Sequence, residues 1–322
     1  MTSIPDLAAA IRKGDRGALA RGITLVESRR DADAGSADAL LQTLLPHAGS
    51  SLRVGITGAP GVGKSTLIEA LGMQLCGAGH RVAVLAVDPS SAVTGGSILG
   101  DKTRMTELSR QANAFIRPSP GGETLGGVAA RTREAMLLCE AGGFDVVLVE
   151  TIGTGQSEVA VHGMVDFFLL LLSPAAGDEL QGIKRGVMEL ADGVLVHKAD
   201  GDLAAAAERA AQQCRIAMHV LHPDGAEPPA VVVGSSLTGA GLDELWRTIE
   251  RVAAARRADG TFAARRGRQA DEWLDSAVRE RLLTAFLADP ATAAAMAAAR
   301  QRVARGEVLA TTAARELVKG RR

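Results

Sequence analysis

The sequence predicts an α/β fold in which helices flank a mostly parallel β-sheet, with an N-terminal helical segment before it and a C-terminal helical extension after it. Short apolar runs rich in β-branched residues alternate with helical stretches from about residue 52 to about residue 250. This alternation is typical of parallel strands joined by crossover helices. Many of the runs are apolar at consecutive positions, as expected for strands that helices cover on both faces.

The predicted strands share this apolar character and are bounded by polar or glycine-containing segments. They are residues 52–57, 81–87, 114–117, 144–150, 167–172, 193–198 and 230–235. The stretches between them have the length that right-handed crossovers need. The clearest predicted helices are residues 64–77, 126–140, 202–219 and 241–256. The most apolar strand is too short to cross a bilayer, so we expect no membrane association.

Helical patterns also flank the alternating block. Residues 4–47 carry apolar positions at helical spacing, with Ser36 as a candidate N-cap before a leucine-rich stretch. Residues 257–270 are rich in arginine and weakly apolar, which predicts an exposed connector or hinge. The ARRGR run at 264–268 contains no aromatic residue on which bases could stack, so we expect no nucleic-acid partner. Residues 271–319 are predicted to form two or three helices.

These patterns predict three parts of the chain. An N-terminal helical segment covers residues 1–50, a central α/β domain covers 51–256, and a C-terminal helical extension covers 257–322. The extension is too small to bury its own apolar face. We therefore expect it to dock on a second copy of the chain and form a homodimer.

Composition sets limits on partners and compartment. The 322 residues are 47% hydrophobic, and 36 Lys and Arg residues nearly balance 37 Asp and Glu residues, giving a formal net charge of -1. No overall field would attract nucleic acid or anionic lipid. The three cysteines form no Cys-x-x-Cys pair and are predicted to be reduced, buried thiols. The first residues lack a secretory signal pattern, so a cytoplasmic location is expected.

The strongest motif follows the first predicted strand. It consists of Gly58, Ala59, Pro60, Gly61, Val62, Gly63, Lys64, Ser65 and Thr66. Small residues let successive backbone N–H groups close around phosphate oxygens, Lys64 can neutralise the β- and γ-phosphates, and the Ser65 hydroxyl can ligate Mg²⁺. The strand, loop and helix occur in the required order. The sequence therefore predicts a P-loop NTPase that binds a nucleoside triphosphate or diphosphate with Mg²⁺.

Acidic residues follow two further strands. Asp88 comes directly after the second predicted strand, and Glu150 ends the fourth. A carboxylate at the carboxyl end of a strand beside the phosphate loop can hold Mg²⁺ directly or through water. Asp101 lies in a glycine-rich loop of the kind that a γ-phosphate orders, although alone it would be expected to cap a helix. Gln156 and Glu158 are candidates for placing the attacking water.

A guanine-recognition pattern follows the sixth predicted strand. Such loops usually have Asn-Lys-x-Asp, and here His197, Lys198 and Asp200 occupy the three defined positions. The carboxylate of Asp200 can accept hydrogen bonds from guanine N1–H and the exocyclic amine, which adenine does not offer in that geometry. Lys198 can pack its stem across the ring. His197 is expected to keep the bond to the phosphate loop and to lose part of the contact that asparagine makes with the base edge.

The loop after the last predicted strand contains Ser235, Ser236 and Leu237, followed by Thr238 and Gly239. A Ser-Ala loop at this place would offer a backbone amide to guanine O6. Each of these guanine signals is weak alone, but together and in this chain order they favour guanine over adenine. The predicted cofactors are therefore GTP or GDP and Mg²⁺.

With these motifs in place, the chain resembles the methylmalonyl-CoA mutase-associated G-protein family of the MeaB/ArgK type. The resemblance covers nearly the whole chain and rests on the segments RGITLVES, GAPGVGKST, VDPSS, GGSILGDKTRM, ETIGTGQSE, PAAGDELQGIKRGVMELAD and HKADGD. This chain departs from the family pattern at His197, where the family has Asn, and at Ser236, where Ala is usual.

The resemblance implies roles for individual residues. Ser65, Asp88, Asp101 and Glu150 would surround Mg²⁺, Asp200 would recognise guanine, and residues 235–237 would close over the base. Residues 177–184 would form a third switch segment that contacts the partner enzyme, with Lys184 as its charged contact. The C-terminal helices would form the homodimer.

The implied activity is a slow GTPase cycle that gates adenosylcobalamin delivery to a cobalamin-dependent acyl-CoA mutase, or protects and reactivates that enzyme. A P-loop kinase remains an alternative, as does a GTPase chaperone for another metalloenzyme, such as the nickel-insertion GTPases. The metal-binding His-rich or Cys-plus-His tract of that second class is absent from this sequence.

Overall fold

The computed structural model of the chain describes residues 3–28, 30–87, 105–118, 125–151, 157–174, 185–222 and 228–319. The chain divides into two compact units, Met1–Gln269 and Ala270–Arg322. In the described residues, the first unit holds the whole β-sheet and the second is helical.

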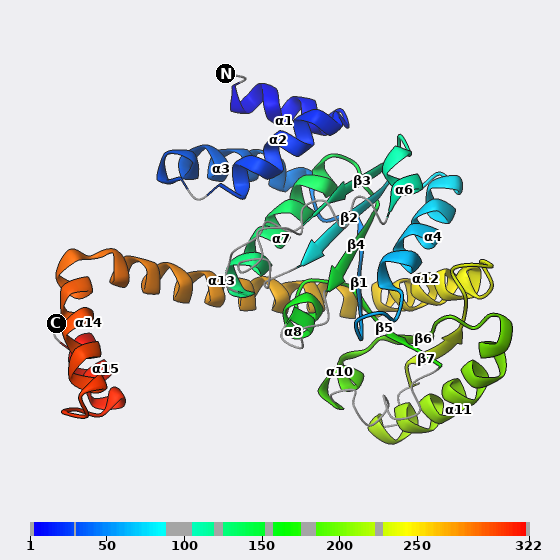
Figure 1. Ribbon diagram of the computed structural model, residues 1–322. Helices are drawn as coiled ribbons and strands as arrows, with labels where there is room; N and C mark the ends of the chain where they lie inside the picture. The colour runs from blue at the N-terminus through cyan, green and yellow to red at the C-terminus, as the bar shows by residue number, and fades with distance from the viewer. Residues whose placement is uncertain are drawn as a thin grey trace. The chain divides into compact units, whose positions relative to one another are not determined.

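The described part of the first unit is built on a seven-stranded sheet in the order β3-β2-β4-β1-β5-β6-β7 (Figure 1). All neighbouring strands in it run parallel. The strands are β1 (Leu52–Gly58), β2 (Val82–Val87), β3 (Ala114–Arg117), β4 (Val146–Thr151), β5 (Phe167–Leu172), β6 (Gly193–Val196) and β7 (Ala230–Val233).

The structure confirms the α/β class and every predicted strand, with differences at the strand ends. His197 and Ser235 were predicted inside strands, but β6 ends at Val196 and β7 ends at Val233. Lys198 has a backbone φ of 60° and is the only non-glycine residue with positive φ among those the structure describes. This conformation is incompatible with an extended strand, so the chain turns at the sheet edge.

Helices cover both faces of the sheet, as the consecutive apolar positions predicted. Val147 and Val149 of β4 are buried in the core on one face, whereas Val146 and Leu148 are buried on the other. On the first face lie α1 (Ile4–Arg12), α2 (Arg16–Val26), α3 (Asp31–Leu44), α7 (Leu125–Ala141), α8 (Ser157–His162), α10 (Arg185–Leu190) and α11 (Ala204–Leu221). On the second face lie α4 (Lys64–Gly77), α6 (Thr106–Arg110) and α12 (Leu242–Ala258).

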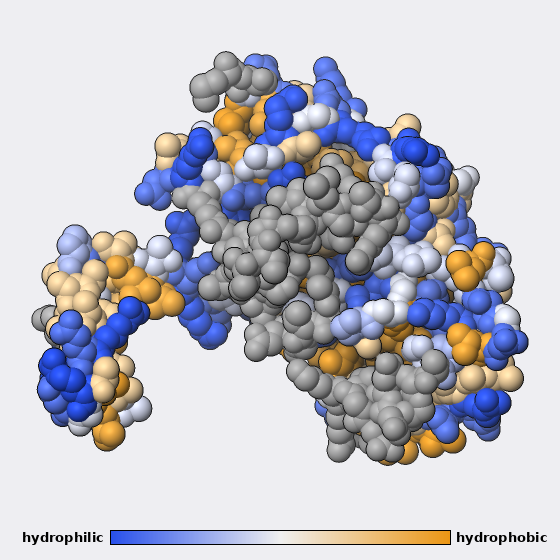
Figure 2. Space-filling model, viewed as in Figure 1, coloured by the Kyte–Doolittle hydropathy of each residue, from blue (hydrophilic) through white to orange (hydrophobic). Residues whose placement is uncertain are grey.

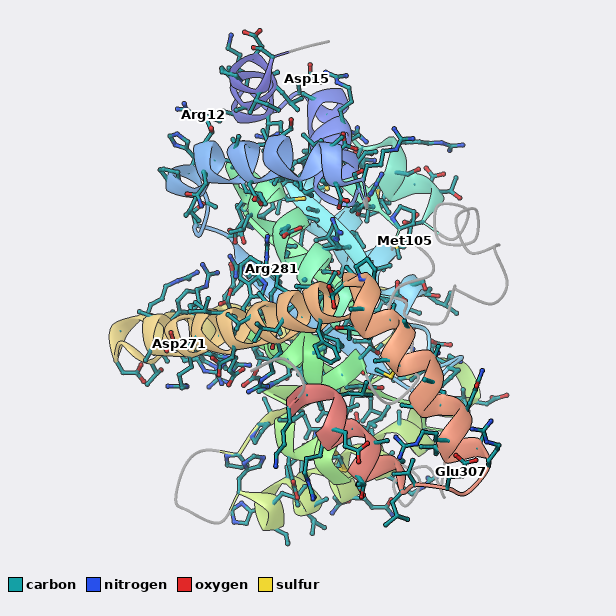
Figure 3. The ribbon with its side chains drawn as sticks, turned by 90° about the vertical axis from the view of Figure 1, so that its left-hand side faces the viewer. Arg12, Asp15, Met105, Asp271, Arg281 and Glu307 are labelled. Carbon is teal, nitrogen blue, oxygen red and sulfur yellow. The ribbon has the colours of Figure 1, made fainter. Side chains whose placement is uncertain are left out.

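The N-terminal helices are part of this core. Helix α1 ends at Arg12, and Asp15 caps α2 by accepting a hydrogen bond from the N–H of Ala18 at 2.9 Å (Figure 3). The prediction of Ser36 as an N-cap is wrong, because α3 already begins at Asp31 and Ser36 lies inside it. Acidic residues in the first turn of α3, including Asp31, are favourable there because they face the positive end of the helix dipole.

The stretch 257–270, predicted as an exposed connector or hinge, is mostly exposed, but it is helical and two of its arginines are held in ion pairs. Helix α13 (Thr261–Ala288) begins inside this stretch. The guanidinium of Arg266 donates to both carboxylate oxygens of Asp166, at 2.7 and 2.8 Å, and Arg265 pairs with Asp192 at 3.1 Å. These arginine side chains are only 17% and 15% exposed. Their partners directly precede β5 and β6, so the arginines fasten the start of α13 to the amino-terminal edge of the sheet.

The second unit contains the later part of α13, α14 (Pro290–Ala304) and α15 (Ala310–Lys319), in agreement with the helices predicted there. Apolar side chains lie on its surface (Figure 2). Five residues of α13 are between 43% and 66% exposed: Leu274, Val278, Leu282, Leu283 and Leu287. Among the described residues no single helix is long and apolar enough to cross a membrane, and only α13 and α14 taken together, as a bent pair, have the length and composition.

Candidate nucleotide-binding site

Several loops with polar residues leave the carboxyl edge of the sheet around β1. The strand order reverses at this strand, because β4, β2 and β3 lie on one side of it and β5, β6 and β7 lie on the other. Loops that leave a parallel sheet at such a point diverge and form a crevice, which is the usual ligand site of these sheets. The phosphate loop, Glu150, the His197 loop and the Ser235 loop all start at this edge.

The phosphate loop joins β1 to α4. Val62 and Lys64 are buried, whereas Pro60, Gly61 and Thr66 are exposed. Gly63 is the N-cap of α4 with a φ of 102°, and a Cβ atom there would lie 2.6 Å from Cε1 of His197. Glycine is therefore required both by the backbone and by the neighbouring ring. No side chain caps α4, so its first N–H groups are available for an anion.

Lys64 is held inside this loop. Its side-chain Nζ donates to the carbonyl oxygens of Gly58 at 2.8 Å and Ala59 at 3.2 Å. Burial lowers the pKa of Lys64, and the charges of Glu150 and Glu158 partly oppose that shift. An ammonium group that is held by neutral carbonyls and is short of water is well suited to exchange these contacts for phosphate oxygens.

Glu150 lies beside the phosphate loop. The residue is 6% exposed, and its carboxylate accepts a hydrogen bond from the Ser65 hydroxyl at 2.8 Å. Hydroxyl and carboxylate oxygens are ligands that Mg²⁺ prefers, so these two residues fit the predicted metal. The described residues contain no group of three or more His, Cys, Asp or Glu side chains that would hold a metal alone. A magnesium site here therefore needs phosphate oxygens, water or residues of the adjacent loops.

Two threonines at this edge were not predicted as part of the site. Thr57 and Thr151 are 1% and 0% exposed, and their hydroxyl groups form a hydrogen bond of 2.9 Å. Thr57 is the penultimate residue of β1 and Thr151 is the last of β4, and the two lie side by side because Ile56 is paired with Glu150 in the sheet. The bond fixes the start of the phosphate loop relative to Glu150. Only a strand register, which the sequence does not reveal, identifies such a pair.

His197 connects the loop after β6 to the phosphate loop. Its Nδ1 lies 2.8 Å from the Val62 carbonyl oxygen and its Nε2 lies 2.6 Å from the Ser236 hydroxyl. The residue is 2% exposed, and burial lowers its pKa, so the ring is neutral at neutral pH. The predicted bond from His197 to the phosphate loop is present. Lys198 makes a second connection by donating from Nζ to the Gly61 carbonyl oxygen at 2.7 Å.

Asp200 and Ser235 are linked across the two base-side loops. The Ser235 hydroxyl donates to the Asp200 carboxylate. The same hydroxyl accepts from the N–H of Leu237 at 3.1 Å, and the Leu237 side chain is 80% exposed. The carboxylate of Asp200 is therefore oriented by a buried serine, and the loop that follows β7 is folded back toward it.

Not all predicted site residues belong to the part of the chain that the structure describes. Asp88, Asp101, Gln156, Lys184 and the predicted switch segment at 177–184 lie outside the described residues. Glu158 is described and lies 5% exposed at the start of α8. Its charge partly opposes the lowering of the Lys64 pKa, which indicates that it lies near the phosphate loop.

Known proteins match this chain over most of its length. A family model described as "Methylmalonyl Co-A mutase-associated GTPase MeaB" matches residues 19–291. The chain is 58% identical over 308 residues to a "Putative GTPase" of Caulobacter vibrioides, covering 95% of this chain and 94% of that protein. It is 48% identical over 280 residues to "GTPase ArgK" of Escherichia coli, covering 87% of this chain and 85% of that protein.

A solved structure has the same fold over the same extent. The crystal structure titled "LAO/AO transport system kinase" matches with a TM-score of 0.77 and 36% sequence identity, covering 98% of this chain and 96% of that one. The likeness therefore includes the helical segments at both ends as well as the sheet.

Proposed function

Because the chain belongs to the MeaB family of methylmalonyl Co-A mutase-associated GTPases, we propose that its GTP cycle gates adenosylcobalamin delivery to a cobalamin-dependent acyl-CoA mutase. Protection or reactivation of the same enzyme would use the same cycle. The observation that carries the proposal is the family match over residues 19–291, which includes every loop of the nucleotide site. GTP hydrolysis is the activity of the family, and the mutase is the partner that its description names.

The phosphate end of the site would work by charge stabilisation. Lys64 and the first N–H groups of α4 would bind the phosphates, since the lysine already lies within the loop that surrounds them. Ser65 and Glu150, with Asp88 and Asp101, would hold Mg²⁺, which neutralises charge on the β- and γ-phosphate oxygens when bound. Glu158, buried beside this charge cluster, is a candidate for placing the attacking water.

The base end would select guanine. Asp200 would accept from guanine N1–H and the exocyclic amine, with its carboxylate oriented by the Ser235 hydroxyl. Lys198, whose Nζ is tied to the phosphate loop, would pack its stem over the base. A backbone amide of the loop 235–237 would donate to guanine O6 and would give up a contact within the protein, such as the 3.3 Å contact of the Ser236 N–H with Nε2 of His197.

The partner would be sensed through the segment at 177–184, with Lys184 as the charged contact. This segment follows β5 and precedes α10, and the loop after α10 carries Asp192, which pairs with Arg256 and Arg265. A change in the segment would reach the amino-terminal edge of the sheet through this connection.

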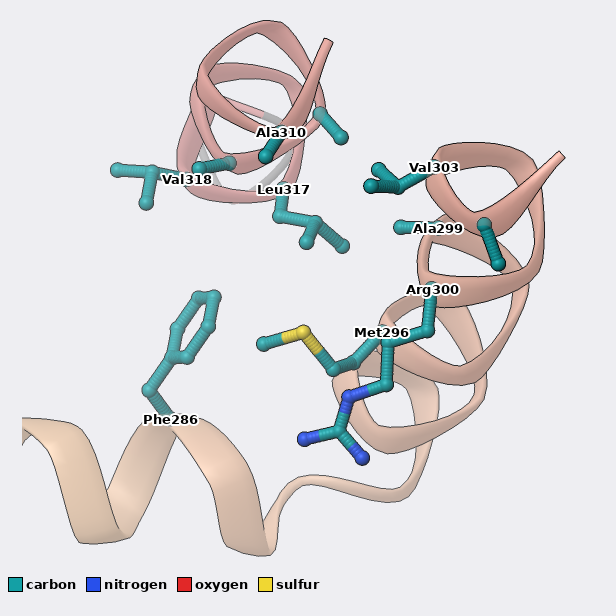
Figure 4. Close-up of a pocket in the computed structure, with 11 residues that line it drawn as sticks. Phe286, Met296, Ala299, Arg300, Val303, Ala310, Leu317 and Val318 are labelled. Atoms are coloured by element: carbon teal, nitrogen blue, oxygen red, sulfur yellow. The ribbon is translucent and has the colours of Figure 1, made fainter. Parts of the chain in front are cut away.

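The second unit would form the homodimer. A cavity of about 410 Å³ opens between α13, α14 and α15, lined mainly by apolar side chains such as Phe286, Met296 and Leu317 (Figure 4). Exposed leucines of α13, including Leu282 and Leu283, add apolar surface in the same unit. Burial of this much exposed apolar surface would favour association, since each leucine contributes ~2 kcal/mol when fully covered.

The test of the function combines the mutase with defined nucleotide states. Purified methylmalonyl-CoA mutase, free of cofactor, is mixed with the protein, adenosylcobalamin and either GTP, GDP or a non-hydrolysable GTP analogue. The absorbance spectrum of the cobalamin reports its transfer to the mutase. We expect this transfer to depend on which nucleotide is present. Identical transfer in all nucleotide states, or no association with the mutase, would contradict the proposal.

A kinase activity is the second candidate, because the matched solved structure carries that title. A kinase transfers the γ-phosphoryl group to an acceptor, whereas a GTPase releases inorganic phosphate. Measuring phosphate released per GTP consumed, in the presence of cell extract as a source of acceptors, separates the two. A ratio close to one supports the GTPase, and a much lower ratio supports the kinase.

A further inference from the structure

The two departures from the usual guanine-binding loops contact each other. His197 stands where such loops have asparagine, and Ser236 stands where alanine is usual. Their side chains come from loops 39 residues apart, and Nε2 of His197 lies 2.6 Å from the Ser236 hydroxyl oxygen. An alanine at 236 would have no side-chain group to offer this ring. The two substitutions thus form one hydrogen-bonded pair.

The partners of His197 fix where its proton lies. Nδ1 is 2.8 Å from the Val62 carbonyl oxygen, which can only accept, so Nδ1 carries the hydrogen. Burial lowers the pKa of the ring, so Nε2 of the neutral ring carries none. Nε2 therefore accepts from the Ser236 hydroxyl at 2.6 Å, and from the Ser236 N–H in a longer contact of 3.3 Å.

This arrangement leaves His197 no N–H group for a ligand. Its only ring N–H is bound to Val62, and the residue is 2% exposed. An asparagine amide, in contrast, has two N–H groups, so it can bind the same carbonyl and still donate to the base edge. On that edge guanine offers N7 and O6, and both are acceptors. Nε2 is an acceptor as well and cannot bind either of them.

We propose that this protein binds guanine without a hydrogen bond from residue 197 to N7, and that His197 and Ser236 instead act as a paired positioning element for the two base-side loops. The inference rests on the guanine site of the proposed function and specifies how the base is held. His197 contacts the phosphate loop at Val62 and at Gly63, where a Cβ atom would collide with the ring. The pair thereby connects the phosphate loop, the Asp200 loop and the loop after β7.

The direct test uses 7-deaza-GDP, in which a C–H group replaces N7 and only that acceptor is lost. Binding of GDP and 7-deaza-GDP to the wild-type chain is measured by isothermal titration calorimetry in the presence of Mg²⁺. We expect the two dissociation constants to agree within about twofold, because no N7 contact is lost. A 7-deaza-GDP affinity weaker by roughly 5-fold or more, the loss expected for one hydrogen bond, would overturn the inference.

Two variants separate the base contact from loop positioning. The double variant His197→Asn with Ser236→Ala restores the usual residues, so it should bind GDP about 3- to 10-fold better than 7-deaza-GDP. Ser236→Ala alone should weaken the binding of GDP and of 7-deaza-GDP alike. The ratio of their dissociation constants should stay near one, since Nε2 of His197 still carries no hydrogen. If the ratio of the two dissociation constants were the same in the double variant and the wild type, the inference would be overturned.

The outcomes also distinguish this inference from the proposed function. A wild-type chain that binds no GDP would overturn both. A chain that binds GDP tightly but discriminates against 7-deaza-GDP would overturn the inference alone. The ratio of the GDP and 7-deaza-GDP dissociation constants is measured on the wild-type chain. It therefore tests whether N7 is bound even if the double variant does not fold.

Discussion

The hydroxyl of Ser65, in the first turn of α4, donates a hydrogen bond of 2.8 Å to the carboxylate of Glu150, the penultimate residue of β4. The phosphate loop and this acid lie 85 residues apart in the chain and are brought together because β1 and β4 are adjacent. The Thr57–Thr151 bond supports the same contact from within the sheet.

Glu150→Gln should reduce Mg²⁺-dependent GTP hydrolysis by ~100-fold. The amide oxygen can still accept from Ser65, so the loop keeps its shape, but the charge that would attract Mg²⁺ is lost. The measurement is phosphate release as a function of Mg²⁺ concentration, and the half-saturating Mg²⁺ concentration should rise. An unchanged Mg²⁺ dependence would exclude Glu150 from the metal site.

Arg266→Ala should lower the free energy of unfolding by ~3 kcal/mol, because it leaves the Asp166 carboxylate, which is 2% exposed, without its charged partner. Urea denaturation measures the change. Arg279→Ala is the matched control on the same helix, since that side chain is 79% exposed and lies 3.9 Å from Asp275. The control should change stability by less than about 0.5 kcal/mol. Equal effects of the two substitutions would contradict the anchoring role of Arg266.

His197 should make the nucleotide-free protein sensitive to acid. Burial, followed by the positive charge of Lys198, lowers the pKa of His197 in the folded chain, while the Val62 carbonyl and Asp200 oppose the shift. The unfolded chain therefore binds a proton more readily just below pH 6.5, so acidification favours unfolding there. In His197→Asn the free energy of unfolding should fall less steeply as the pH drops below 6.5. If the free energy of unfolding fell equally steeply with pH in the wild type and the variant, His197 would not contribute to the acid sensitivity.

Leu282→Glu should convert a wild-type dimer into a monomer, because the substitution puts a charge into the apolar surface of α13 that dimerisation would cover. Light scattering after size-exclusion chromatography gives the mass. Ile216→Glu on α11 is a suitable control, since Ile216 is similarly exposed at 62% against 66% for Leu282. A monomeric wild type, or a dimer that survives the Leu282 substitution, would rule out this surface as the interface.

The sequence predicted the strands, the family and the phosphate loop because each depends on local patterns. Apolar runs mark buried strands wherever they pair, and the GAPGVGKST segment places phosphate contacts within nine consecutive residues. The features that the sequence did not predict depend on contacts between residues far apart in the chain. Arg265 and Arg266 belong to an arginine-rich run that is typical of a solvated segment. In the structure they form ion pairs with Asp192 and Asp166, which the sequence does not indicate. Likewise, nothing local indicates that Ser236 donates to His197 or that Thr57 meets Thr151.

The base preference of Asp200→Asn tests the guanine site most directly. Dissociation constants of GDP and xanthosine diphosphate are measured for wild type and variant. If Asp200 recognises guanine, the wild type prefers GDP, and the asparagine variant, which presents an N–H to the second carbonyl of xanthine, loses GDP affinity by ~100-fold and prefers xanthosine diphosphate. GDP affinity and base preference that stay unchanged in the variant would contradict the assignment of this loop as the guanine site.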